Sequence, residues 1–218
     1  MSTVPVTVVD YGLGNLYSVE RALQSTGAEV SLSSDPEEIA RAPRLVLPGV
    51  GAFADGMRGL RERNLVEPLR RYASTGRPLL GICLGMQMLA SVSEEFGEHE
   101  GLDLIPGRVR AISSSTVAGQ PHKIPHIGWN ALQPASSPWA GSMLEDTSPG
   151  TAVYLVHSFH VQPSDPRHLL ATCEYGGHAI TAAIRSGGIF GCQFHPEKSG
   201  PAGLQMLRAF LRAAPAGA

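Results

Sequence analysis

The sequence predicts an α/β fold in which a mostly parallel central sheet is flanked by helices and continues into an antiparallel β extension. Short apolar runs alternate with helical patterns through the first half of the chain, as in βαβ units. Glycine-rich loops follow several of these runs, where the carboxyl ends of parallel strands bind ligands. In the second half, apolar runs follow one another without helices between them, which favours antiparallel strands.

The composition bounds the kind of protein. A chain of 218 residues that is 43% hydrophobic can bury one sizeable core, so we expect a single domain over residues 1–218. The net charge of −2, without a long basic block, argues against nucleic acid as the main partner. No apolar run approaches the ~20 residues of a membrane span, and we expect no signal peptide.

The cysteines indicate the compartment. There are three of them, Cys83, Cys173 and Cys192, widely spaced along the chain. This number and spacing fit neither a disulfide framework nor a zinc site, so we expect a cytoplasmic protein without a metal. Nothing else in the sequence calls for a cofactor.

The first half is expected to alternate strands and helices. The strands are continuous apolar or β-branched runs at Val4–Val9, 29–32, Leu45–Leu47 and Leu79–Ile82. One helix follows Asn15 as its N-cap, and a second follows Asp35, with Glu38 able to close a capping box. Further helices are expected over 60–73 and 86–90.

The second half is expected to extend the sheet. We predict a strand at 107–112, a polar loop or hairpin tip at 113–120, and a loop over 134–150. Three apolar runs at 152–156, 169–173 and 179–184 are predicted to join the central sheet as antiparallel strands. A last strand at 189–194 and a closing helix at 203–211 complete the chain.

Cys83 lies in the stretch around which the chain is organised. It stands between an apolar run and a helical run, with Gly81 and Gly85 two residues away on either side, as in a nucleophile elbow. Such a turn exposes the thiol at the sheet edge and directs the N–H of Leu84 towards a developing oxyanion. The alternative is a buried cysteine that acts as a small apolar residue.

A cysteine nucleophile requires a base, and His195 is the candidate. It follows an apolar strand, and Glu197 comes two residues later, after a proline that forms a rigid turn. An imidazole accepts the thiol proton, and a carboxylate fixes its tautomer. His157, at the end of another predicted strand, is the best alternative base.

Two glycine-containing loops follow strands. Gly49 and Gly51 flank Val50, so peptide planes in this loop can turn, and the N–H of Val50 is a candidate second oxyanion donor; an ordinary turn is the alternative. The Gly-x-Gly at Gly12 and Gly14 hints at phosphate binding, but the third glycine of the dinucleotide fingerprint is missing, which leaves a tight turn.

These motifs resemble a known family. Gly81-Ile-Cys-Leu-Gly-Met-Gln87 together with Phe194-His-Pro-Glu197 is similar to the triad class of glutamine amidotransferases. The motifs at 10–15, 47–53, 123–130, 154–158 and 195–199 further resemble the glutaminase subunits of imidazole glycerol phosphate synthases. The resemblance spans nearly the whole chain, and the motifs at 10–15 and 123–130 are specific to this subunit.

The resemblance implies roles for individual residues. Cys83 would be the nucleophile, His195 the base and Glu197 its orienting carboxylate. The loop that contains Val50 resembles the family's oxyanion strand. The residues that match glutamine-binding positions are Gly49, Gly51, Gln87, Glu95, Ser158 and Phe159.

The resemblance also implies a partner and a reaction. Ammonia from L-glutamine would pass to a separate (β/α)₈ cyclase, which forms imidazole glycerol phosphate and AICAR ribonucleotide in histidine biosynthesis. Asn15, Trp129 and Lys198 match the surface that would face this cyclase in a heterodimer.

Other functions remain possible from the residues alone. A subunit that serves anthranilate or pyridoxal phosphate synthesis would carry the same triad, but the 123–130 motif argues against it. A free-standing cysteine hydrolase or peptidase would be active without a partner. A non-enzymatic scaffold would have no use for the intact triad.

Overall fold

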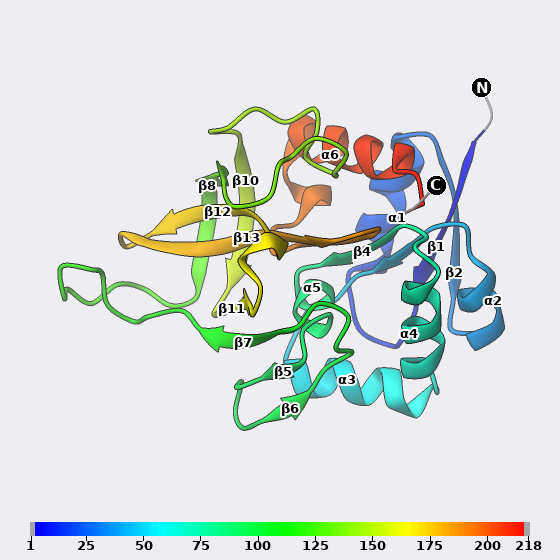
Figure 1. Cartoon of the computed structure of the whole chain (residues 1–218), viewed down its shortest axis with the longest axis horizontal. Helices are drawn as coiled ribbons and strands as arrows, with labels where there is room; N and C mark the ends of the chain where they lie inside the picture. Colours follow the sequence, from blue (N-terminus) through cyan, green and yellow to red (C-terminus); the bar gives the residue numbers. More distant parts are fainter. Residues whose placement is uncertain (1–2, 216–218) are drawn as a thin grey trace.

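The computed structural model describes residues 3–215, which contain the predicted central sheet. Its strand order is β2-β1-β3-β4-β14-β13-β12-β9, parallel from β2 to β14 and antiparallel beyond it (Figure 1). The strands are β1 Val4–Val9, β2 Ala28–Ser33, β3 Leu45–Leu47, β4 Leu79–Ile82, β9 Gln133–Pro134, β12 Leu169–Tyr175, β13 His178–Ser186 and β14 Ile189–Cys192. The α/β prediction is confirmed.

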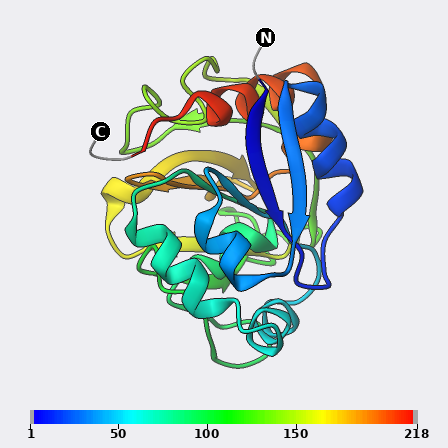
Figure 2. The same ribbon diagram turned by 90° about the vertical axis from the view of Figure 1, so that its right-hand side faces the viewer.

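Helices cover both faces of this sheet (Figure 2). α1 (Leu16–Ser25) and α6 (Gly200–Arg212) pack on one face through residues such as Leu23 and Phe210. The opposite face is covered by α2 Pro36–Arg41, α3 Phe53–Glu62, α4 Val66–Ser74 and α5 Leu84–Met88. Short 3₁₀ turns occupy Pro166–His168 (η1) and Pro196–Lys198 (η2).

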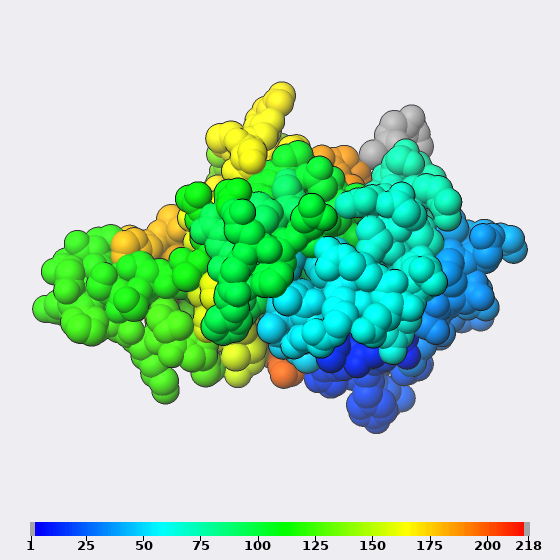
Figure 3. All heavy atoms as spheres, turned by 90° about the horizontal axis from the view of Figure 1, so that it is seen from below, coloured from blue at the N-terminus to red at the C-terminus, as the bar shows by residue number. Residues whose placement is uncertain are grey.

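Two smaller sheets flank the antiparallel end. β10 (Ala152–His157) pairs with β8 (His126–Ala131), and Val153 and Leu155 of β10 join the α1/α6 side of the core. The other sheet has the order β11-β7-β5-β6 and joins the opposite side. Its strands are β11 Phe159–Pro163, β7 Gly107–Ala111, β5 Val92–Ser93 and β6 His99–Glu100. The segment between β7 and β8 projects from one end of the molecule (Figures 1 and 3).

The prediction that 152–156 joins the central sheet is wrong. β10 alternates between buried and half-buried residues, so it packs one face on the core and leaves the other accessible. The chain then passes from β10 to β11 through Ser158 alone, and so moves from one small sheet to the other. The runs at 169–173 and 179–184 do extend the central sheet, as predicted.

Two predictions in the first half also need correction. The helix expected over 60–73 is two helices, because Asn64 adopts a left-handed conformation (φ 56°) and interrupts it. Asp35 caps α2 as expected, but Glu38 does not return to the backbone of Asp35. Its carboxylate instead accepts a hydrogen bond from the Ser33 hydroxyl (2.5 Å), which in turn accepts one from the N–H of Asp35 (3.0 Å).

The other predicted elements agree with the structure apart from their ends, whereas strands β5, β6, β8, β9 and β11 were not predicted. α5 begins at Leu84 and α6 at Gly200, each a few residues before the predicted start. Residues 135–150 form no helix or strand. No helix within residues 3–215 combines the length and apolar character needed to cross a lipid bilayer.

Candidate active site

Cys83 occupies a strained turn at the carboxyl end of β4. Its φ of 54° and ψ of −111° lie outside the regions that side-chain-bearing residues normally adopt, a cost that folded proteins tolerate mainly at functional sites. A Cβ on Gly81 would lie 2.8 Å from the backbone of Gly85, so β4 and α5 approach each other closely only because position 81 is glycine, whereas a Cβ on Gly85 would collide with the carbonyl of Leu47 at the end of β3. The N–H of Cys83 donates to the carbonyl of Cys192 (2.7 Å), which fixes the turn to β14.

His195 and Glu197 form a buried pair beside this thiol. The Nδ1 of His195 lies 2.8 Å from Oε1 of Glu197, and both side chains are almost completely buried. Their turn is fixed to β10 by two bonds. The N–H of His195 donates to the carbonyl of Tyr154 (3.0 Å), and the N–H of Tyr154 donates to the hydroxyl of Ser199 (3.0 Å), which itself donates to the carbonyl of His195 (2.7 Å).

The surroundings of His195 favour its charged form. Burial lowers the pKa of the imidazole, but hydrogen bonds to Cys83 and Glu197 outweigh this effect and raise the pKa to about 9. The imidazole is therefore protonated at neutral pH next to the thiol. A cysteine paired with an imidazolium is poised as a thiolate nucleophile that has an acid at hand for the leaving group.

The elbow and the pair open into one small cavity of about 260 Å³. It is lined by Val50, Gly51, Cys83, Leu84, Gln87, Glu95, Val156, His157, Ser158, Phe159 and His195. The structure therefore brings together most of the site residues expected from the sequence. Glu197 lies behind His195, with Oε2 buried and without a hydrogen-bond partner among residues 3–215.

Gly49 is the predicted substrate-binding residue that does not line the cavity. It is buried beneath the loop, where a Cβ would collide with the hydroxyl of Tyr11 and lie 2.9 Å from Cβ of Leu84. Gly51, by contrast, has φ 97° and open space around it. The two glycines therefore serve different needs, close packing at Gly49 and a left-handed backbone at Gly51.

Tyr11 anchors the start of this loop, a role that sequence reasoning missed. Its buried hydroxyl donates to the carbonyl of Pro48 (2.8 Å), one residue before Gly49. Burial, with a smaller contribution from Cys83, raises the pKa of this phenol above its usual range, so it stays a neutral donor. The start of the loop is thus held at Pro48, whereas Val50, two residues later, is 40% exposed.

Two predicted binding residues already make contacts inside the chain. The amide of Gln87 donates to the carbonyl of Phe159 (3.1 Å) and to Oε1 of Gln193 (3.0 Å). The carboxylate of Glu95 accepts a bond from the N–H of Phe53 (2.7 Å) at the start of α3. Both polar groups are thus held in fixed positions at the cavity wall.

Sequence reasoning also missed Gln193. Its Nε2 lies 3.7 Å from Sγ of Cys83, and the side chain is fully buried. The only signal was its place directly before the Phe194–Glu197 motif. His157, the alternative base, lines the cavity but has both ring nitrogens engaged elsewhere: Nδ1 with the carbonyl of Phe159 (2.9 Å) and Nε2 with His126 (3.1 Å).

The three residues expected at a partner surface lie outside the cavity. Trp129 is 58% exposed on β8, and Lys198 is exposed at the end of η2. Asn15 is half-buried and caps α1 through its side-chain oxygen, which accepts from the N–H of Ser18 (3.3 Å). η2 packs against both α1 and β10, so the three positions belong to neighbouring elements.

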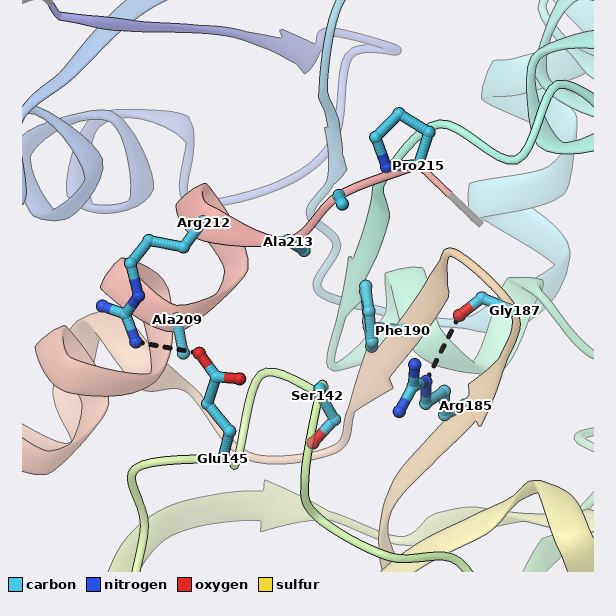
Figure 4. Close-up of a pocket in the computed structure, with 11 residues that line it drawn as sticks. Ser142, Glu145, Arg185, Gly187, Phe190, Ala209, Arg212, Ala213 and Pro215 are labelled. Carbon is cyan, nitrogen blue, oxygen red and sulfur yellow. Dashed lines mark hydrogen bonds and ion pairs between the residues drawn. The ribbon is translucent and has the colours of Figure 1, made fainter. Parts of the chain in front are cut away.

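A larger cavity of about 410 Å³ lies elsewhere, between α6, β14 and the 141–145 loop (Figure 4). There Arg212 pairs with Glu145 (3.0 Å), and Arg185 donates to the carbonyl of Gly187 (3.3 Å). This cavity contains no nucleophile–base pair. Among residues 3–215, no group of three or more His, Cys, Asp or Glu side chains is arranged to hold a metal ion.

Comparisons with known proteins show the family to which the chain belongs. The family model described as glutamine amidotransferase class-I matches residues 7–214. An imidazole glycerol phosphate synthase subunit HisH 1 from Legionella pneumophila (strain Paris) is 54% identical over 209 residues, which cover 95% of this chain and 98% of that protein. The subunit HisH from Moorella thermoacetica is 44% identical over 206 residues, which cover 94% of this chain and 93% of that protein.

Among solved structures, PurLQS from Thermotoga maritima matches with a TM-score of 0.73 at 18% identity, over 96% of this chain and 98% of that one, which shows the shared fold. The family model matches a range of this chain that contains Cys83, His195 and Glu197, and the HisH relatives match nearly the whole chain. The chain therefore belongs to the class-I glutamine amidotransferases and, within them, to the family of imidazole glycerol phosphate synthase HisH subunits.

Proposed function

We propose that this chain hydrolyses L-glutamine to glutamate and ammonia, and that Cys83, His195 and Glu197 are its catalytic triad. The observation that supports this most strongly is the strained Cys83 turn, which opens into the same cavity as His195 with its buried carboxylate partner. The thiolate of Cys83 attacks the side-chain carbonyl of glutamine. The imidazolium of His195 gives its proton to the departing ammonia, and the bond between sulfur and carbon remains as a thioester.

The second half of the reaction uses the same groups. His195, now neutral, takes a proton from water, which attacks the thioester and releases glutamate and the thiolate. The N–H groups of Leu84 and Val50 are the proposed oxyanion donors. Gln87, Glu95, Ser158 and Phe159 are proposed to bind glutamine, with the Glu95 carboxylate suited to its ammonium group. Gly49 and Gly51 support the loop from which Val50 donates.

The ammonia is proposed to pass to a second protein. The relatives' names describe subunits of imidazole glycerol phosphate synthase. On that basis we propose that residues 1–218 form one amidotransferase domain that pairs with a (β/α)₈ cyclase in the cytoplasm. The complex would form imidazole glycerol phosphate and AICAR ribonucleotide in histidine biosynthesis. Asn15, Trp129 and Lys198 are proposed to face the cyclase.

The proposal is tested by measuring glutamate release with the chain alone and in complex with the cyclase and its nucleotide ligand. We expect the complex to be about 10²–10³-fold faster, the usual effect of gaining one oxyanion donor. The structural reason is the loop around Val50, where Gly51 permits a turned peptide and the partner would select the productive orientation. Equal rates with and without the partner would indicate a free-standing hydrolase instead.

Lys198→Ala should impair glutamine-dependent synthesis, in which one subunit releases the ammonia and the other uses it. Lys198 is exposed and directly follows Glu197, so it lies at the rim of the site, where charges become desolvated when a partner covers them. We expect glutamine-dependent synthesis in the complex to fall about tenfold while ammonia-dependent synthesis stays unchanged. Arg41→Ala, an exposed charge on α2, is the matched control. Unchanged glutamine-dependent synthesis and unchanged affinity for the cyclase would assign Lys198 to an ordinary solvated surface.

A further inference from the structure

Two buried histidines lie directly opposite each other, one in the cavity wall and the other behind it. His126 on β8 and His157 on β10 are paired in the antiparallel ladder, and only 3% and 6% of their surfaces are exposed. Nδ1 of His126 lies 3.1 Å from Nε2 of His157. The ring of His126 also stacks on the ring of Tyr175, with the ring centres 4.0 Å apart, and this contact restricts the orientation of the imidazole. The triad chemistry described above makes no use of this pair.

The hydrogen-bond partners determine which nitrogen carries each proton. Nδ1 of His157 faces the carbonyl of Phe159 (2.9 Å), an obligatory acceptor, so Nδ1 of His157 must donate. In the neutral ring Nε2 then accepts, and Nδ1 of His126 must donate to it. Nε2 of His126 is left as an acceptor and faces the side-chain amide of Asn130 (3.4 Å). Every hydrogen bond in this series is therefore donated in the same direction, from β8 towards Phe159.

The environment keeps both rings neutral, as this arrangement requires. Burial lowers the pKa of His157 to about 3, and burial together with the nearby His122 lowers the pKa of His126. Protonation of either ring would place two N–H groups face to face. At ordinary pH both imidazoles are thus neutral, and the hydrogen bond between His126 and His157 links β8 to β10.

The link ends at a wall of the cavity. The carbonyl of Phe159 accepts from both His157 and the amide of Gln87, and all three residues line the cavity. Ser158, where the chain passes from one small sheet to the other, lies between His157 and Phe159. At the other end, β8 exposes Ile127 (52%) and Trp129 (58%) on the outside of the molecule.

We propose that His126 is a positioning residue for glutamine binding. Through His157 it fixes the carbonyl of Phe159, and so ties the Ser158–Phe159 segment of the substrate cavity to β8. This inference rests on the proposed glutaminase function and on the proposed contact of Ser158 and Phe159 with glutamine. His126 contacts no reacting atom. Its effect is on the geometry of bound substrate.

The test compares variants of the complex with the cyclase. His126→Leu removes the donor and leaves Nε2 of His157 buried without one, which should raise KM for glutamine about tenfold while kcat changes less than about threefold. His126→Asn keeps a side-chain N–H near the position of Nδ1 and should restore most of the affinity. Ammonia-dependent synthesis should be the same in all of them. His99→Leu, a histidine on β6 outside the cavity lining, is the control and should leave KM unchanged.

A second variant separates this role from a general loss of packing. His157→Asn retains a donor for the carbonyl of Phe159 but breaks the contact with His126, so it should raise KM about as much as His126→Leu. Because both changes break one link, the double variant should be no worse than either single variant. Additive losses, or an unchanged KM in a folded His126→Leu complex, would overturn the inference. A wild-type complex that releases no glutamate would overturn the proposed function itself.

Discussion

Replacing Cys83 by alanine is expected to abolish glutamine-dependent synthesis in the complex, with a loss of about 10⁴-fold or more in kcat. The thiolate forms the covalent bond to the substrate, and alanine offers no replacement. Ammonia supplied from solution should still sustain synthesis at the wild-type rate, since the cyclase does not need this thiol. Both activities are measured on one preparation of the complex.

Cys173→Ala is the matched control for this experiment. Cys173 is also a buried free cysteine, but burial raises the pKa of its thiol to about 12, and it lies on β12 outside the cavity. We expect the control to keep glutamine-dependent synthesis. Substantial glutamine-dependent turnover in Cys83→Ala would show that another group is the nucleophile.

Glu197→Gln is expected to lower kcat for glutamine hydrolysis by about 10²–10⁴-fold. The carboxylate is buried against His195 with an Oε1–Nδ1 distance of 2.8 Å, and an amide of the same shape cannot stabilise the imidazolium. One polar atom of the new amide takes the place of Oε2, which is buried and has no hydrogen-bond partner among residues 3–215. The kinetic constants are measured in the complex, with Glu94→Gln on the exposed surface as the control.

The pH profile gives this variant a second readout. Burial lowers the pKa of His195, but the bonds to Cys83 and Glu197 raise it to about 9, so the wild-type enzyme should lose its proton donor only as the pH rises through about 9. Loss of the carboxylate removes one of the raising effects, and the alkaline limb of kcat/KM should move to lower pH. An unchanged limb would mean that Glu197 does not control the protonation of His195.

The elements that could be predicted from sequence are those with a strong local pattern. β3, β4 and the last four residues of β1 are runs of apolar or β-branched residues, apart from Gly81, because they are buried on both faces. The elbow at Cys83 could be predicted because tight packing demands glycine on either side of it, at 81 against the backbone of α5 and at 85 against the carbonyl of Leu47. The His195–Glu197 pair could be predicted because the two residues are only two positions apart in the sequence.

Features that depend on distant pairing could not be predicted. The alternation along β10 indicates which side is buried but not which strand it pairs with, so its placement beside β8 was missed. The break between α3 and α4 falls at Asn64, and its one sequence signal is Pro68 in the first turn of α4, which a continuous helix over 60–73 would not tolerate. The contact of His126 with His157 spans 31 residues and needs the register of two strands. Tyr11 reaches Pro48 across 37 residues for the same reason.

The central claim is that Cys83 forms a covalent intermediate with the side-chain acyl group of glutamine. The most direct measurement is to mix the complex with glutamine, quench it in acid during turnover, and locate the acyl adduct by mass spectrometry of peptides. We expect a glutamyl thioester on Cys83, absent from Cys83→Ala and enriched in Glu197→Gln if hydrolysis of the thioester becomes the slower step. An adduct on Cys173 or Cys192 instead, or steady glutamate release with no adduct on Cys83 at any time, would contradict it.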